Sequence, residues 1–225
     1  MDLINHKNLY LGISEKEDGS MKDSLENRLS FFKKIGLDDK IIISAGLVHG
    51  NKVLVVDDFY SNQSVEGYDA LITSRDDTLL TITIADCLPI YFYDKNKKII
   101  ALAHAGWRGV ISNIASRVIE VFVNNYKSSP DDIDIFVGPH IRNCHFEIQK
   151  DILDKFNESA LLRKNNKILV DLSKVVKNQL IELGVNKNNI NISDECTHCL
   201  ENKYFSYRRD RLQGLKTMVA YLGLK

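Results

Sequence analysis

The stretch spanning residues 81–109 constrains this chain more than any other, because it places a cysteine and a histidine inside two apolar runs. The first run covers residues 79–93 and the second covers residues 98–104, and both are rich in Ile, Thr, Tyr and Phe. Four polar residues, 94–97, separate the runs as a turn separates two strands. The pattern therefore predicts an antiparallel hairpin.

The expected register of this hairpin brings the cysteine and the histidine together. A two-residue turn at residues 95–96 sets Asp94 opposite Lys97, and the ladder then places Cys87 opposite His104. Directly opposed residues have Cβ atoms about 4.5–5.5 Å apart, so a thiolate and an imidazole can share one metal ion or one proton. Pro89 cannot donate a ladder hydrogen bond, which predicts a bulge or a sheet edge just beyond the cysteine.

Regular elements are expected along the rest of the chain. An amphipathic helix starts near Asp23, shows Leu25, Leu29 and Phe32 at helical spacing, and ends at Gly36. Further helices are expected at residues 111–122, 151–156 and 171–183, and strands at residues 41–44, 53–56, 70–73, 133–137, 168–170, 190–192 and 217–222. With no internal repeat or Gly- or Pro-rich linker, the pattern predicts one α/β domain with a mixed sheet over residues 1–225.

Composition narrows the class of partner. Thirty basic and thirty acidic side chains leave no formal net charge, which argues against nucleic acid or an anionic membrane as the main partner. The longest apolar runs fall short of a membrane span, and the first residues, MDLINHKNLY, lack the features of a signal peptide. We therefore expect a cytoplasmic location, where four cysteines are thiols or metal ligands rather than disulfides.

Three residues are candidate metal ligands. A zinc ion with three protein ligands and an open fourth position activates water, and His49, Cys87 and His104 have suitable side chains for such a set. The alternative is that each histidine is a hydrogen-bonded core residue and the cysteine a small buried hydrophobe.

Two other groups of residues are open to more than one interpretation. Cys196 and Cys199 form a CxxC pair around His198, but the sequence has no second CxxC, which favours two thiols without a metal. Between them and the hairpin lies a polar group that could supply a ligand or a proton carrier, or could be ordinary surface residues: His140, Cys144, His145 and Glu147. Arg108, Arg208 and Arg209 suit phosphate, although solvated arginines are common.

Longer motifs resemble those of a known family. They are Val48-His49-Gly50, Asp69-Ala-Leu-Ile-Thr73, Ala85-Asp86-Cys87-Leu88-Pro89-Ile90, His104-Ala-Gly-Trp-Arg-Gly109, Gly138-Pro139-x-Ile141 running to Phe146-Glu147-Ile148, and Cys196-Thr197 followed by Phe205-Ser-Tyr-Arg-Arg-Asp210. In this order and at these spacings the chain resembles the laccase-domain family, which was formerly described as multicopper polyphenol oxidases and is now described as purine nucleoside phosphorylases. The likeness extends over nearly the whole chain.

The resemblance implies a fold, a metal and a reaction. The fold is a four-layer α/β/β/α sandwich, and the ligands of the zinc ion are His49, Cys87 and His104. Related proteins cleave adenosine, inosine, guanosine and S-methyl-5'-thioadenosine with phosphate and deaminate adenosine. Some bacterial members are linked to peptidoglycan precursor editing, and the fold is similar to that of a Cys-His hydrolase toxin domain. Leu47 and Leu215 stand where relatives often have glutamine and arginine, which bears on substrate preference.

The two reactions assign roles to further side chains. For deamination, a carboxylate near the ion moves the proton, and the candidates are Asp86 and Glu147. For phosphorolysis, cationic side chains hold phosphate, and the candidates are Arg28, Arg108 and Arg208.

Three other functions remain open. The first is a metal-independent amidase or hydrolase in which His104 activates Cys87 as a nucleophile. A copper oxidase is disfavoured because several coppers need more than six histidines. The last is a zinc-stabilised binding module, which unfolds when the metal is removed.

Overall fold

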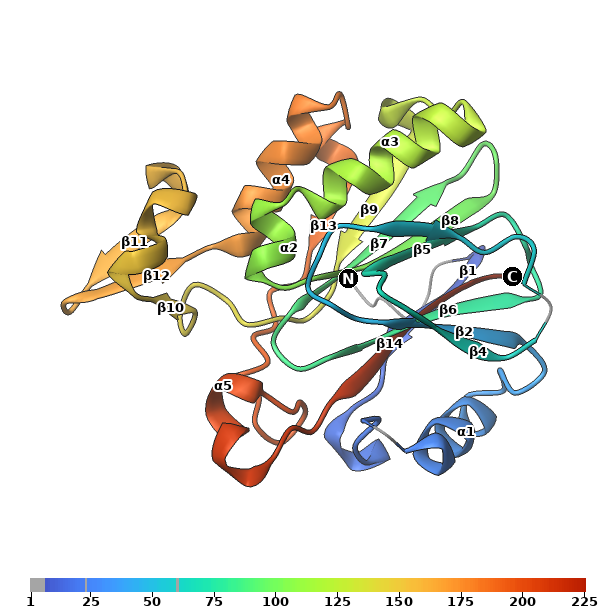
Figure 1. Cartoon of the computed structure of the whole chain (residues 1–225), viewed down its shortest axis with the longest axis horizontal. Coiled ribbons are helices and arrows are strands. Elements are labelled where there is room, and N and C mark those ends of the chain that lie inside the picture. Colours follow the sequence, from blue (N-terminus) through green and yellow to red (C-terminus); the bar gives the residue numbers. More distant parts are fainter. Residues whose placement is uncertain (1–6, 23, 60) are drawn as a thin grey trace.

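The computed structural model describes residues 7–22, 24–59 and 61–225. Two large sheets pack face to face, and helices cover the outer face of each, which gives four layers (Figure 1). The expected α/β/β/α sandwich with mixed sheets is therefore confirmed.

The first sheet has five strands and one covering helix. Its order is β1 (Leu9–Ile13), β14 (Met218–Leu224), β6 (Thr78–Ile84), β2 (Ile41–Gly46) and β4 (Gln63–Glu66). β14 is antiparallel to both of its neighbours, whereas β2 is parallel to both of its own. Helix α1 (Leu25–Lys34) covers the outer face, where Phe31 and Phe32 pack with Leu79.

The second sheet has six strands and three covering helices. Its order is β13 (Ile190–Ile192), β9 (Ile133–Val137), β7 (Leu88–Asp94), β8 (Ile99–Ala105), β5 (Ala70–Thr73) and β3 (Val53–Val55). The outer face packs against α2 (Trp107–Ile111), α3 (Ile114–Tyr126) and α4 (Leu172–Glu182). The inner face meets the five-stranded sheet through buried residues such as Leu80 and Leu102.

Smaller elements complete the chain. A three-stranded arm of β10 (Glu147–Ile148), β12 (Lys167–Val170) and β11 (Leu161–Lys164) projects from the sandwich at the left of Figure 1. The short helix α5 (Tyr207–Asp210) precedes β14. Short 3₁₀ helices occur at Lys16–Asp18, Pro130–Asp132, Lys150–Lys155, Glu158–Ala160, Lys187–Asn189 and Arg211–Gln213.

The hairpin forms, but its predicted register is wrong. Asp94 pairs with Ile99, so four residues form the turn, and Pro89 rather than Cys87 lies opposite His104. The reason is local: the carboxylate of Asp94 accepts hydrogen bonds from the backbone amides of residues 96 and 97, and Lys98 adopts a positive φ of 54°. An aspartate that caps the amides after it favours this longer turn.

The first apolar run is two strands rather than one. β6 belongs to the five-stranded sheet and β7 to the six-stranded sheet, so the chain crosses between the sheets at residues 85–87. The expectation of an edge strand at Pro89 is also wrong, because β7 lies between β8 and β9. Proline is tolerated there because pairing with β9 begins only at Ile90.

Most other predicted elements are confirmed, with four differences. Asp23, the expected helix start, lies outside the described residues, and Ser24 is the N-cap of α1. Leu29, expected on the apolar face, is exposed. The helix expected at residues 111–122 is two helices, α2 and α3, because Asn113 takes a left-handed conformation. The helix expected at residues 151–156 is a 3₁₀ turn. Strands β1, β4, β10 and β11 are short or lack clear alternation and were not expected.

Candidate metal centre

The three predicted metal ligands converge. His49 follows β2, Cys87 lies in the crossover from β6 to β7, and His104 is the penultimate residue of β8. One ligand atom from each side chain lies within 4.8 Å of the other two, and the two imidazole rings meet edge to face with centroids 4.8 Å apart. His104 is buried, Cys87 is partly exposed and His49 is exposed, so the group opens to solvent on the His49 side.

Asp69 holds both His104 and the loop that carries His49 in position. Its buried carboxylate accepts hydrogen bonds from Nδ1 of His104 at 2.9 Å and from the backbone amides of Val48, His49 and Gly50 at 3.3, 2.9 and 2.7 Å. With Nδ1 engaged, Nε2 of His104 is the nitrogen left for a metal ion. Histidine ligands commonly donate a hydrogen bond from their other ring nitrogen to a carboxylate in this way. The sequence motif contained Asp69, but its role was not assigned there.

Gly106 leaves the room that the trio needs. A Cβ atom built on Gly106 would lie 2.9 Å from Cδ2 of His49 and 3.1 Å from Sγ of Cys87. Real Cβ atoms essentially never approach another heavy atom as closely as the first of these distances. The glycine after β8 is therefore required by the close approach of the two ligands.

The cysteine and the buried histidine stabilise each other's charged forms. Burial alone would raise the pKa of Cys87, but the neighbouring His104 cation and hydrogen bonds from both histidines lower the pKa to about 7. Burial alone would lower the pKa of His104, but the Cys87 thiolate and the Asp69 carboxylate raise the pKa to about 9. Without a metal, the pair therefore favours thiolate and imidazolium.

Asp86, the residue before Cys87, holds the crossover between β6 and β7 in place. Asp86 is buried, has a positive φ of 86°, and accepts hydrogen bonds from Oγ1 of Thr197, Oγ of Ser206 and the backbone amide of Arg208 at 2.7, 3.0 and 2.7 Å. Backbone conformations of this kind in non-glycine residues concentrate at functional sites. His49 also has a positive φ, 59°.

The arginines expected to bind phosphate lie in different places. Arg108 is exposed in the first turn of α2, with its guanidinium carbon 4.4 Å from the centre of the Trp107 ring. Arg208 donates from its guanidinium to the carbonyl of Glu147 at 3.0 Å. Nε of Arg28 donates to the carbonyl of Met21 at 2.8 Å, and its helix α1 lies on the other side of the two sheets from α2 (Figure 1).

Glu147, the second candidate for proton transfer, lies in the arm. Its side chain pairs with Nζ of Lys167 at 2.9 Å, and its strand β10 pairs with β12. Among the contacts of the described residues, none joins the Glu147 carboxylate to the trio.

The structure also assembles a second group of ligand-type side chains. Cys144, His145, Cys196 and Cys199 have ligand atoms within 4.8 Å of one another. The sequence has no second CxxC to complete a four-ligand set with Cys196 and Cys199. In the structure, Cys144 and His145, from the chain between β9 and β10, complete the set.

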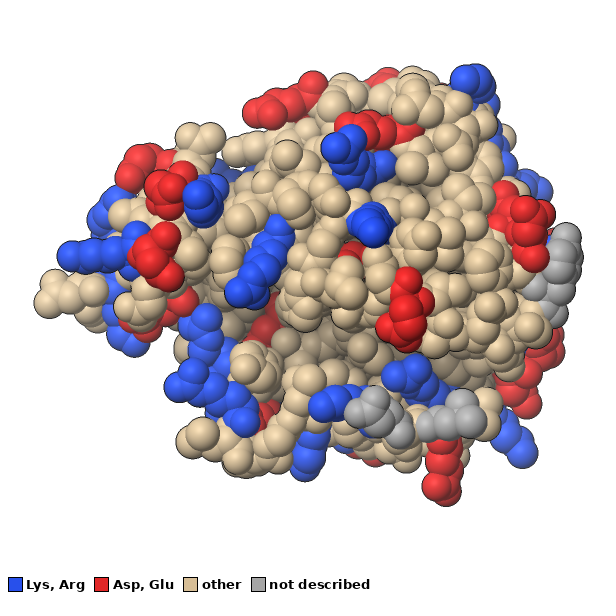
Figure 2. All heavy atoms as spheres, viewed as in Figure 1, with Lys and Arg blue, Asp and Glu red and all other residues tan. Residues whose placement is uncertain are grey.

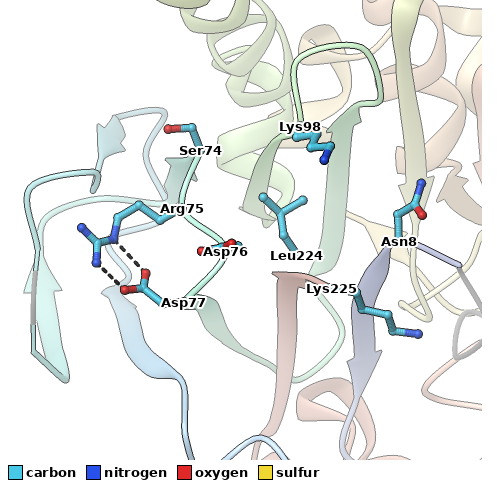
Figure 3. Close-up of a pocket in the computed structure, with 8 residues that line it drawn as sticks. All are labelled: Asn8, Ser74, Arg75, Asp76, Asp77, Lys98, Leu224 and Lys225. Carbon is cyan, nitrogen blue, oxygen red and sulfur yellow. Dashed lines mark hydrogen bonds and ion pairs between the residues drawn. The ribbon is translucent and has the colours of Figure 1, made fainter.

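A separate pocket lies away from the trio. It is lined by Asn8, Ser74, Arg75, Asp76, Asp77, Lys98, Leu224 and Lys225, with Arg75 paired to Asp77 (Figure 3). Lys98 immediately precedes β8 and His104 is six residues further on, so the two ends of this strand are roughly 20 Å apart. The pocket and the trio therefore lie at opposite ends of β8.

Two surface properties bear on the class of partner. On the face shown in Figure 2, basic and acidic side chains are interspersed. Among the described residues, no helix combines the length and hydropathy required to cross a bilayer.

Relatives of known sequence match most of the chain. A purine nucleoside phosphorylase of Borreliella burgdorferi is 39% identical over 70% of this chain and 69% of the relative. One of Clostridium acetobutylicum is 37% identical over 63% of this chain, and the match spans 61% of that relative's length. An adenosine deaminase from an unknown prokaryotic organism is 28% identical over 92% of this chain and 85% of the relative.

Solved structures and a family model also match nearly the whole chain. Hypothetical protein YfiH of Bacillus licheniformis superimposes with a TM-score of 0.86 at 26% identity over 96% of this chain and 93% of that one. YlmD of Geobacillus stearothermophilus gives a TM-score of 0.85 at 26% identity over 96% and 92%. The family model described as multi-copper polyphenol oxidoreductase laccase matches residues 6–224. The chain therefore belongs to this laccase-domain family.

Proposed function

We propose that His49, Cys87 and His104 hold a zinc ion and that the site acts on purine nucleosides. The observation that carries the proposal is the convergence of these side chains above Asp69, which orients His104. Histidine nitrogen and cysteine sulfur both bind zinc, and three protein ligands leave the fourth position for a reactant, as in catalytic zinc sites. The names of the relatives, purine nucleoside phosphorylase and adenosine deaminase, support the substrate class.

The residues present fit zinc better than several coppers. The three ligand atoms are close enough to share one ion, and Gly106 keeps a side chain out of the space between them. A bound zinc ion would supply Lewis acidity and activate water for attack. One cysteine and two histidines could also take a single copper ion, and metal analysis of the purified protein separates these possibilities.

Two reactions follow from this assignment. In deamination, water adds to C6 of adenosine, the bond from C6 to the exocyclic nitrogen breaks, and ammonia leaves with the transferred proton. In phosphorolysis, a phosphate oxygen attacks C1′ of the ribose while the bond from C1′ to N9 breaks and the base takes up a proton. Arg108 is exposed close behind Gly106 and is our first candidate for the phosphate. Arg28 and Arg208 remain candidates, although both also hold backbone carbonyls.

The proton carrier can be identified by comparing two variants. Asp86 lies next to Cys87, but three donors already engage its carboxylate, whereas Glu147 pairs with Lys167 in the arm. Asp86→Asn and Glu147→Gln each remove one carboxylate charge. The variant that loses turnover while keeping its metal content and fold identifies the carrier.

The proposed function is tested by incubating the protein with adenosine, with and without phosphate, and separating the products. Inosine formed in either condition reports deamination, and adenine formed only with phosphate reports phosphorolysis. Cys87→Ala should abolish both activities together with the zinc ion held by the trio. Formation of neither product by zinc-loaded protein would contradict the proposal.

The charge state of Cys87 favours a second candidate, a thiol amidase or hydrolase. Cys87, His104 and Asp69 form a chain of nucleophile, base and orienting carboxylate, and the pKa of the thiol is about 7. An amide of a peptidoglycan precursor is then the substrate class to try. Full activity in the presence of a chelator, with inactivation by iodoacetamide, would support this candidate over zinc chemistry.

The remaining expectations belong to the same proposal. We propose that residues 1–225 act as one domain and that the protein is cytoplasmic, where its four free cysteines would stay reduced. The partners are a small nucleoside and phosphate.

A further inference from the structure

Four ligand-type side chains meet away from the catalytic trio. Cys144 and His145 come from the turn between β9 and β10, and Cys196 and Cys199 come from the turn after β13. Sγ of Cys144 lies 3.7 Å from Sγ of Cys199, and Nδ1 of His145 lies 3.3 Å from each of these sulfurs. All four ligand atoms lie within 4.8 Å of one another.

These separations are close to those of a tetrahedral zinc site. Zinc–sulfur bonds of about 2.3 Å and zinc–nitrogen bonds of about 2.0–2.1 Å place tetrahedral ligands roughly 3.8 Å apart for two sulfurs and roughly 3.5 Å apart for sulfur and nitrogen. The distances of 3.7 and 3.3 Å in the cluster are similar to these values. The spacing is well beyond the 2.05 Å of a disulfide bond.

We propose that Cys144, His145, Cys196 and Cys199 form a second, structural zinc site. Three thiolates and one imidazole complete a four-coordinate shell, so the site has no open position for a reactant, unlike the trio. Soft sulfur ligands also select zinc over magnesium or calcium. The assignment does not depend on the function proposed for the trio.

The surroundings of the cluster suit this role. The backbone amide of Arg142 donates to Sγ of Cys196 at 3.4 Å, and the ring of His145 stacks on His198 with centroids 3.9 Å apart. A backbone amide that donates to a ligand in this way helps to hold that ligand in place. Cys196 is buried, whereas Cys144 and Cys199 are exposed, so an ion can enter from solvent.

The second site would also brace the catalytic one. Thr197 lies between the two cysteines of the CxxC pair, and its Oγ1 donates to Asp86 at 2.7 Å. Asp86 directly precedes Cys87 in the crossover between the sheets. A metal that fixes the turn at residues 196–199 therefore fixes one of the three donors that hold Asp86.

The test uses the Cys87→Ala variant, in which the trio has lost its sulfur ligand. Protein purified under reducing conditions with zinc present, and then desalted, should keep about one zinc per chain. Replacement of the metal by Co²⁺ should give tetrahedral ligand-field bands with strong sulfur-to-cobalt charge transfer. The remaining thiols should react slowly with a thiol reagent until a chelator is added.

A second substitution assigns the ligands. Cys87→Ala/Cys199→Ser should lose the remaining zinc, whereas Cys87→Ala/His198→Asn should keep it, because His198 supplies no ligand atom to the cluster. If the Cys199→Ser protein does not fold, the cobalt spectrum of Cys87→Ala alone still decides the matter. A metal-free Cys87→Ala protein with three freely reactive thiols or a Cys144–Cys199 disulfide would overturn the proposal, as would full zinc retention after Cys199→Ser.

Failure of this proposal is distinguishable from failure of the proposed function. If the native protein holds one zinc ion and Cys87→Ala holds none, the zinc ion belongs to the trio and the second site is refuted. Retention of one zinc in Cys87→Ala, with no activity toward adenosine in the native protein, would give the reverse result.

Discussion

A single carboxylate, that of Asp69, connects the loop that carries His49 to strand β8, which carries His104. It accepts from Nδ1 of His104 and from three consecutive backbone amides, including that of His49. Burial alone would raise the pKa of Asp69, but the hydrogen bonds from His104 and the Gly50 amide lower it. The side chain therefore remains ionised where it supports the candidate ligands.

Asp69→Asn is expected to weaken zinc binding by about 10–100-fold, the usual effect of removing a carboxylate behind a histidine ligand. Competition with a chromophoric chelator measures the change. Asp94→Asn is the matched control, because Asp94 is also buried and also accepts backbone amides, at the opposite end of the hairpin. Equal zinc affinity in the native protein and Asp69→Asn would contradict the orienting role.

Gly106→Ala is expected to remove the zinc ion of the trio while largely retaining the fold. The new Cβ would press on His49 and Cys87 at 2.9 and 3.1 Å, so these two side chains would have to separate. Gly50→Ala is the control, because its Cβ would meet its nearest neighbours at an ordinary 3.5 Å. Metal content and circular dichroism check the result, and a zinc content equal to that of the native protein would refute the steric argument.

At the scale of the elements, α3 is fixed to the six-stranded sheet by its last residue. Oη of Tyr126 donates to Oδ2 of Asp57 at 2.9 Å, just beyond β3. The same carboxylate accepts from Thr73 and from the amide of Ser74 at the end of β5. Burial, followed by the hydrogen bond to Asp57, raises the pKa of Tyr126.

This shift predicts alkaline destabilisation. Because the folded pKa exceeds the unfolded value of about 10, the stabilisation is present below pH 10 and is lost as the pH rises above it. Above pH 10, the free energy of unfolding should fall less steeply with pH in Tyr126→Phe than in the native protein, by up to about 1.4 kcal/mol per pH unit. Urea unfolding across pH 9–11 measures the slopes. Identical slopes would show that Tyr126 ionises equally in both states.

The elements also show where sequence reasoning succeeded. β5, β9 and β13 have their predicted bounds, because each is a short apolar run that fits a buried strand. The hairpin register was wrong because Asp94 caps a longer turn. Cys87 and His104 nevertheless meet, since the crossover at Asp86 brings the cysteine beside the end of β8.

At the scale of the whole molecule, the two sheets share a buried hydrogen bond. Oη of Tyr91, in β7 of the six-stranded sheet, donates to the carbonyl of Gly12 in β1 of the five-stranded sheet at 2.8 Å. Tyr91 is almost fully buried in the layer between the sheets. The bond therefore links the layers where water does not compete.

Tyr91→Phe is expected to lower the free energy of unfolding by about 1 kcal/mol or slightly more, because the carbonyl of Gly12 loses a partner. The slope of the unfolding free energy against denaturant concentration should not change, because the variant and the native protein expose nearly the same surface on unfolding. Tyr207→Phe, at an exposed position, is the control. A Tyr91→Phe protein as stable as the native one would show that the bond contributes nothing net.

The sequence by itself determined most of the short strands, two of the amphipathic helices and the three candidate ligands in the trio, because these depend on local spacing and on motifs that are contiguous in the chain. Only the tertiary structure decided which distant side chains meet. Asp69 and the second cluster of Cys144, His145, Cys196 and Cys199 became identifiable through contacts between segments far apart in the sequence. Such contacts arise from how the sheets pack and where the chain crosses between them, and no local pattern of residues encodes that geometry.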